Sequence, residues 1–173
     1  MSDRTARHVE LRPAPLEQKP ALANLLELYA HDFSEFHPIE LGADGRFHYP
    51  HLEAYWRDPE RFPFLATVDQ QLAGFVLVQR GSQISGDKSV WDIAEFFVMQ
   101  SYRRRGIGAV TAHNVWTRFP GRWEVRVMHA NQAAVSFWQA AIERFVGKPV
   151  HPVGVERGVV VWNVFSFVSL PSI

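Results

Sequence analysis

The stretch "DIAEFFVMQSYRRRGIGAVTAHNVW", which covers Asp92 to Trp116, decides the fold of this chain. It opens with an apolar run typical of a buried strand, passes three consecutive arginines and two glycines, and continues in a helical pattern. Gly106 and Gly108 lie at the turn between strand and helix, where glycine lets the backbone turn with exposed N–H groups. Because the first turn of a helix has unpaired N–H donors and a positive dipole end, the stretch predicts an anion site, most naturally for phosphate.

Two better-known phosphate loops do not fit this stretch. The dinucleotide-binding pattern needs a third glycine where Thr111 stands, and the P-loop needs a Gly-Lys-Ser/Thr sequence that is absent. A plainer interpretation stays open on these residues alone. The turn would then be a tight strand-to-helix connection with the arginines in solvent.

Composition narrows the class of protein. The chain has 173 residues, which fits a single domain spanning residues 1–173. Hydrophobic residues make up 47% of the chain and charged residues 21%, which is close to the average amino-acid composition of globular proteins. Because 18 basic residues balance 18 acidic ones, we expect no nucleic-acid partner and one local basic patch at Arg103 to Arg105.

Cysteine and histidine usage excludes several kinds of site. The chain has no cysteine, which excludes disulfides, zinc–cysteine sites and cysteine nucleophiles, and suits a cytoplasmic protein. Of the eight histidines, His48 and His51 form the closest pair, with Pro50 between them, so we expect no metal site. The first fifteen residues lack the apolar segment of a secretory signal, and no run of about 18 apolar residues predicts a membrane span.

The hydrophobic pattern predicts an order of elements along the chain. Strands are expected near residues 8–14, 64–68, 72–79, 90–99, 123–128, 149–155 and 159–168, and helices over 16–36, 51–59, 106–119 and 133–145. A loop rich in proline and glycine separates the first two helices. This order predicts an α/β or α+β domain built around one mixed sheet.

With its flanks, the opening stretch resembles the GCN5-related N-acetyltransferase (GNAT) superfamily. The central motif of that family, Arg/Gln-x-x-Gly-x-Gly/Ala, is matched by Arg103, Gly106 and Gly108. The family continues with a helix, a strand and a motif like Asn-x-x-Ala-x-x-Phe-Tyr, which is matched by "NQAAVSFW" at 131–138. Both motifs occur in order on the expected elements, and together they cover residues 91–145.

The resemblance implies a mostly antiparallel sheet of about six to seven strands flanked by helices, and acetyl-CoA as the cofactor. It implies that loop amides from Arg104 to Ala109 hold the pyrophosphate, that Phe97 to Met99 pair with the pantetheine arm, and that the Val98 N–H faces the thioester carbonyl. The implied cofactor contacts are Phe97, Val98, Met99, Arg103, Arg104, Arg105, Gly106, Ile107, Gly108, Ala109, Asn131, Phe137 and Trp138.

The second motif departs from the family at its last position. The family often has tyrosine there as a general acid, whereas this chain has Trp138. An indole N–H donates a hydrogen bond but does not reprotonate a thiolate, so core packing is the preferred role of Trp138. Asn131 is also a good N-cap for the following helix, and Phe137 is a core residue as well as a wall of the cofactor channel.

Two carboxylates are candidates for the general base that an attacking amine needs. Asp92 and Glu95 lie three residues apart on the expected strand, so a regular strand points them to opposite faces. A β-bulge, which is common in this strand of the family, would move either one. Glu95 is the preferred base because a carboxylate inside an apolar run needs a reason to be there. The alternatives are a paired structural carboxylate at Glu95 and an ordinary edge residue at Asp92.

The acceptor is expected beside the N-terminal helices. Asp32, Glu35 and His37 are candidates for binding a cationic amine, with Tyr49, Tyr55 and Trp56 as walls. These residues are also consistent with a helix end, a solvated loop and a core-facing aromatic cluster.

The leading hypothesis is an acetyl-CoA-dependent N-acetyltransferase that acetylates a primary amine, in a small molecule or a peptide, by direct attack on the thioester. A second hypothesis is a non-catalytic acyl-CoA-binding or sensing module of the same fold. A third, a nucleic-acid-binding domain built on the arginine cluster, is disfavoured by the zero net charge. The apolar C-terminal strands allow a homodimer.

Overall fold

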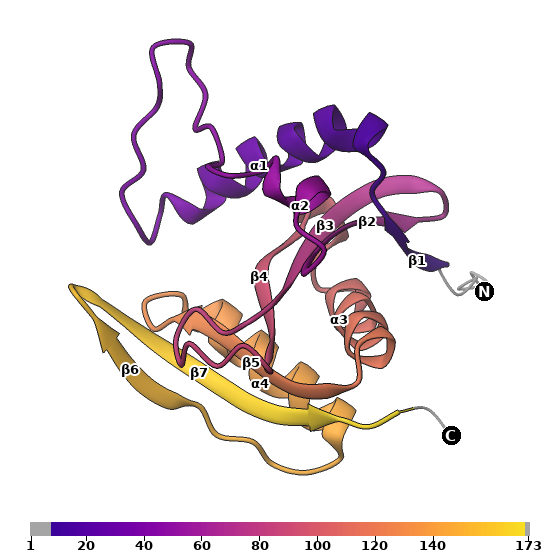
Figure 1. Ribbon diagram of the computed structural model, residues 1–173, viewed down its shortest axis with the longest axis vertical. Helices are drawn as coiled ribbons and strands as arrows, with labels where there is room; N and C mark the ends of the chain where they lie inside the picture. The colour runs from indigo at the N-terminus through magenta and orange to yellow at the C-terminus, as the bar shows by residue number, and fades with distance from the viewer. Residues whose placement is uncertain (1–7, 172–173) are drawn as a thin grey trace, which may run out of the picture.

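A computed structural model describes residues 8–171 and contains a seven-stranded sheet in the order β1-β2-β3-β4-β5-β7-β6 (Figure 1). Residues 1–7, where the sequence predicts no secretory signal, and 172–173 lie outside the described part. The strands are β1 (Val9–Pro13), β2 (Arg61–Val68), β3 (Gln71–Arg80), β4 (Trp91–Val98), β5 (Gly121–Met128), β6 (Val153–Arg157) and β7 (Val160–Ser169). The helices are α1 (Lys19–Phe33), α2 (Ala54–Arg57), α3 (Ile107–Arg118) and α4 (Gln132–Val146), with 3-10 turns at Leu16–Gln18 and Gln100–Tyr102.

The order of elements confirms the sequence prediction, and prolines lie beside two of the elements whose bounds differ. α1 begins with Pro20 in its first turn, where a missing N–H costs nothing, and its last residue is Phe33 because Pro38 follows the next turn. β6 begins only at Val153, since prolines at 149 and 152 cannot donate to a strand ladder.

Helices cover the two faces of the sheet and bury separate cores. On one face α3 and α4 pack over a cluster that includes the fully buried Trp116, Trp123 and Phe165. On the other face α1 and α2 cover a smaller cluster around Leu22 and Phe75. Among the helices of residues 8–171, none is both long and apolar enough to cross a bilayer.

The centre of the sheet opens between β4 and β5. These two strands are parallel and pair only at Trp91 with Trp123 and at Asp92 with Glu124, so within residues 8–171 the rest of this edge of β4 has no strand partner. Figure 1 shows β4 and β5 diverging beyond that point. Because the Met99 N–H donates to Ala73 on β3, alternation along the strand turns the amide of the preceding residue toward the open edge.

A β-bulge interrupts β4 next to this opening. Ile93 is paired with Val78 and Glu95 with Leu77, which leaves Ala94 as the extra residue. A bulge changes which face the following side chains reach. Ala94 and Phe97 therefore pack in the core under α1, whereas Ile93 packs on the face covered by α3 and α4.

We predict that Gly74→Ala destabilises the protein by about 3 kcal/mol, because a β-carbon at Gly74 would lie 2.0 Å from the carbonyl oxygen of Phe97. The two strands would have to separate to admit it. Urea unfolding monitored by tryptophan fluorescence measures the change. Gly154→Ala is the matched control, since a β-carbon there meets no atom within 4 Å. Equal stability of the two variants would contradict the tight β3–β4 approach.

Candidate active site

A cleft of about 460 Å³ lies where β4 and β5 separate. Its walls come from α1, the loop between α1 and α2, the middle of β4 and β5, the start of α4, and β7. The lining residues are Tyr29, Ala30, Phe33, Ile39, Phe47, His48, Tyr49, Pro50, Gln83, Ile93, Ala94, Glu95, Phe96, Val125, Arg126, Val127, Met128, Asn131, Ala134, Trp138 and Trp162.

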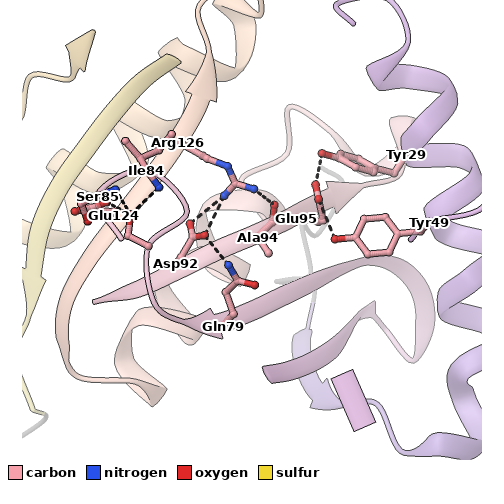
Figure 2. A network of polar contacts seen from close by, with 11 residues as sticks. Tyr29, Tyr49, Gln79, Ile84, Ser85, Asp92, Ala94, Glu95, Glu124 and Arg126 are labelled. Carbon is pink, nitrogen blue, oxygen red and sulfur yellow. Dashed lines mark hydrogen bonds and ion pairs between the residues drawn. The ribbon is translucent and has the colours of Figure 1, made fainter. Parts of the chain in front are cut away.

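Glu95 is a buried carboxylate that lines this cleft. The hydroxyl groups of Tyr29 and Tyr49 donate to its two oxygens at 2.5 Å and 3.1 Å (Figure 2). Burial raises the pKa of Glu95 above its ordinary value, although the two hydroxyls and the charge of Arg126 oppose the shift. Burial also raises the pKa of both tyrosines, so their hydroxyls stay protonated and keep donating.

Asp92 lies on the same face of β4 as Glu95, because the bulge at Ala94 changes the alternation between them. Its carboxylate accepts from Arg126 at 3.0 Å and from the side-chain amide of Gln79 at 3.1 Å. Burial raises the pKa of Asp92 to about 6 against the attraction of Arg126. Asp92 is not among the residues that line the cleft, and its side-chain partners are Arg126 and Gln79.

Arg126 joins the two halves of this polar network, and the sequence analysis missed it. Besides Asp92, its guanidinium donates to the carbonyl oxygen of the bulged residue Ala94 at 3.3 Å and lies 5.6 Å from the ring centre of Trp162. A signal was present in "GRWEVRVM", where charged residues at 122, 124 and 126 alternate with buried apolar ones on β5. That alternation marks a polar face in the middle of the sheet.

The loop before α3 has the backbone that an anion site requires. Arg104 and Gly106 have positive φ angles of 57° and 78°, and no side chain caps the first turn of α3. By contrast Asn131 caps α4, since its side-chain oxygen accepts from the Ala134 N–H at 3.0 Å. The first amides of α3, from Ile107 onward, therefore keep their donors for an outside acceptor.

Gly108 is required by close packing. A β-carbon there would lie 3.0 Å from the ring of Phe137, which packs against Phe96 at a ring-centre distance of 5.9 Å. Trp138 is 6% exposed and meets the same Phe96 ring edge-on at 4.8 Å. Phe137 and Trp138 therefore belong to the core that supports the loop, and Trp138 also lines the cleft.

The three arginines of the loop have different surroundings. The Arg103 side chain donates to the carbonyl oxygen of Val98 at 2.7 Å and forms an ion pair with Asp32 at the end of α1. It thus turns back toward α1. Arg104 and Arg105 are exposed, and within residues 8–171 their side chains have no hydrogen-bond partner.

The predicted acceptor residues are scattered by the structure. Asp32 is held by Arg103 and Gln100, and Glu35 and His37 are exposed and do not line the cleft. Tyr55 is 3% exposed in the core under α1, where burial raises its pKa to about 12.

Trp56 is also placed away from the cleft, since its indole N–H donates to the Ala14 carbonyl at 2.9 Å. Tyr49 does reach the cleft, as one of the expected walls. The sequence indicates Tyr29 only as part of the apolar face of α1, because nothing in it shows that the hydroxyl meets Glu95.

Comparison with known proteins identifies the family and the fold. A sequence profile of the Acetyltransferase (GNAT) family matches residues 22–141. No curated protein sequence gives a significant match to the chain.

Solved structures similar to this chain share its fold at low identity. An acetyltransferase from Thermus thermophilus has a TM-score of 0.66 at 18% identity over 92% of this chain and 96% of that one. Arabidopsis thaliana NAA60 in complex with acetyl-CoA has a TM-score of 0.61 at 15% identity, over 93% and 98% of the two chains. The ribosomal-protein-S18-alanine N-acetyltransferase from Escherichia coli has a TM-score of 0.62 at 12% identity, over 95% and 96%.

We predict that Arg126→Met destabilises the protein by about 3–5 kcal/mol, because it leaves the buried carboxylate of Asp92 without its counter-charge. The double variant Arg126→Met with Asp92→Leu should recover most of that loss. Urea unfolding at pH 7 measures both. Arg122→Met is the matched control on the same strand, because the Arg122–Asp87 pair is exposed and its loss should change stability far less. Similar losses for both arginine variants would contradict the buried pair.

Proposed function

The chain belongs to the Acetyltransferase (GNAT) family, and on this basis we propose that it is an acetyl-CoA-dependent N-acetyltransferase acting on a primary amine. The observation that carries the proposal is the position of Glu95. This buried carboxylate lies in the cleft beside the open edge of β4, and a short 3-10 turn and loop connect that edge to the uncapped first turn of α3.

The residues at this edge fit the cofactor. The amides from Arg104 to Ala109 are the proposed donors to the pyrophosphate, and the left-handed Arg104 and Gly106 and the uncapped start of α3 support this role. A β-carbon on Gly106 would meet no atom within 4 Å, so this side of the loop is open. Phe97 to Met99 would hold the pantetheine arm along the open edge of β4, with Asn131, Phe137 and Trp138 beside it.

Glu95 is the proposed general base. An alkylammonium with a pKa of about 10 must lose a proton before its nitrogen attacks, and a carboxylate in the cleft can accept that proton directly or through water. Tyr29 and Tyr49 hold the carboxylate in place. The raised pKa of Glu95 makes it a stronger base than an exposed glutamate.

The backbone N–H of Val98 is the proposed donor to the carbonyl oxygen of the acetyl group. It faces the open edge because the Met99 N–H is used by β3. A fixed donor at the position where negative charge develops lowers the barrier to attack. Acetyl-CoA supplies the acetyl group as a thioester, and its thiolate is a moderate leaving group with a pKa near that of cysteine, about 8.5.

A second candidate function rests on Trp138. This residue stands where the family often has a tyrosine acid, and the indole cannot replace it. A non-catalytic acyl-CoA-binding module would keep the loop and the open edge without turnover. A cytoplasmic location and a homodimer also stay predictions from the sequence.

We predict that the purified protein releases free thiol from acetyl-CoA when a suitable primary amine is present, and that Glu95→Gln lowers kcat by about 10²- to 10⁴-fold. Because the base must be ionised, the rate of the parent enzyme should rise with pH through the raised pKa of Glu95, above the ordinary 4.5. The rate of the Glu95→Gln variant should not show this rise at acidic pH. A thiol assay across pH 5–9 measures both.

Glu124→Gln is the control for this experiment, because that glutamate contacts Ser82 and does not line the cleft. Binding of acetyl-CoA without thiol release over a broad amine panel would favour the non-catalytic module. Absence of both binding and release would refute the proposed function.

We predict that Gly106→Val and Gly108→Val each weaken acetyl-CoA binding by more than about 10-fold, whereas Arg105→Ala weakens it by less than about 3-fold. Valine is strained at the positive φ of Gly106, and at Gly108 it collides with Phe137. Isothermal calorimetry measures the affinities, and circular dichroism checks that each variant is folded. The reverse order would mean that the arginine side chains, rather than the backbone, hold the cofactor.

A further inference from the structure

Part of the cleft lining around Glu95 is aromatic. This region includes Tyr29 and Phe33 on α1, Phe47 and Tyr49 on the following loop, and Trp162, which contacts Arg126, on β7. Its walls are therefore largely aromatic. In Figure 1 the loop between α1 and α2 stands on one side of the opening and the β6–β7 hairpin on the other.

The loop between α1 and α2, which forms one wall of the cleft, is held in place by contacts with α1. Glu27 on α1 accepts from the backbone N–H groups of Phe47 and His48 at 2.7 Å and 3.2 Å. The same carboxylate lies 3.7 Å from the Arg46 guanidinium. These bonds fix the backbone that carries Phe47 and so place its ring in the cleft.

Negative charge is scarce in this region. Of the residues that line the cleft, Glu95 is the one carboxylate. Three nearby acids have other partners: Glu27 holds the loop, Asp32 pairs with Arg103, and Asp44 pairs with His48 at 2.8 Å. Glu35 and Glu40 are exposed and do not line the cleft. The Trp162 ring is already covered by Arg126. A second ammonium group on the acceptor would therefore lose its hydration without gaining a counter-charge.

We propose that the acceptor is a small primary amine with a single positive charge and an aromatic or bulky apolar group close to the nitrogen. The inference rests on the proposed function, and it names one chemical class of acceptor for that site. The amine would lie against Glu95, and the apolar group would be buried among Tyr29, Phe33, Phe47 and Trp162. Diamines, polyamines and lysine side chains of basic peptides are disfavoured.

Three amines and one peptide test this proposal at saturating acetyl-CoA. 2-Phenylethylamine should have a kcat/KM about 10- to 100-fold above that of n-butylamine, which lacks the ring, because burying a phenyl group contributes about that much. Its kcat/KM should also exceed that of 1,4-diaminobutane and that of an N-terminally blocked lysine peptide by at least the same factor. Preference for the diamine or the peptide, with thiol release intact, would overturn the inference and leave the proposed function standing.

Phe47→Ala should lower kcat/KM for 2-phenylethylamine by about 10-fold, mostly through KM, with little change for n-butylamine or for acetyl-CoA affinity. Leu41→Ala is the matched control, because Leu41 lies on the same loop, is 57% exposed and does not line the cleft. Equal losses for both amines in Phe47→Ala would overturn the assignment of this wall.

Calorimetric titration of the same amines into protein saturated with CoA separates binding from chemistry. Tighter binding of 2-phenylethylamine than of 1,4-diaminobutane supports the inference even if no thiol is released, in which case the proposed reaction alone fails. Equal or reversed affinities would overturn it.

Discussion

The buried ion pair between Arg126 and Asp92 is the interaction on which the site depends. Asp92 belongs to the last pair between β4 and β5, with Glu124, and Arg126 lies two residues further along β5, where the strands have separated. The same guanidinium holds the carbonyl of the bulged residue Ala94, and the bulge turns Glu95 onto the face of α1. Without Arg126 the buried carboxylate of Asp92 would lose its counter-charge. One arginine thus links Asp92, the bulge and the cleft that Glu95 lines.

Backbone and side chains have separate tasks in this site. The proposed cofactor side consists of main-chain features: an open strand edge, left-handed residues and an uncapped helix. The acceptor side relies on side chains that converge from α1, a long loop and β7 onto one carboxylate. Such an arrangement lets the members of a family bind the same cofactor and different acceptors, because loop side chains can vary without altering a strand or a helix.

The sequence predicted the elements and the loop well because those features are local. Hydrophobic periodicity and the glycines at 106 and 108 fix short-range geometry, and the structure places strands and helices in the predicted order. The side-chain contacts of the candidate site could not be predicted from the sequence in the same way. Glu95 meets Tyr29 across 66 residues and Tyr49 across 46, and no pattern in one sequence reports such meetings. The charge of Asp32 predicted a role in binding the acceptor, and only the structure shows that Arg103 engages it.

The Arg103–Asp32 contact has a further consequence for how the two ends of the cleft are connected. Asp32 and Tyr29 are three residues apart on α1, and so they lie on one face of a single helical turn. The first is paired with Arg103 in the loop before α3, and the second is hydrogen-bonded to the carboxylate of Glu95. One turn of α1 therefore links the loop before α3 to the hydroxyl group that hydrogen-bonds Glu95.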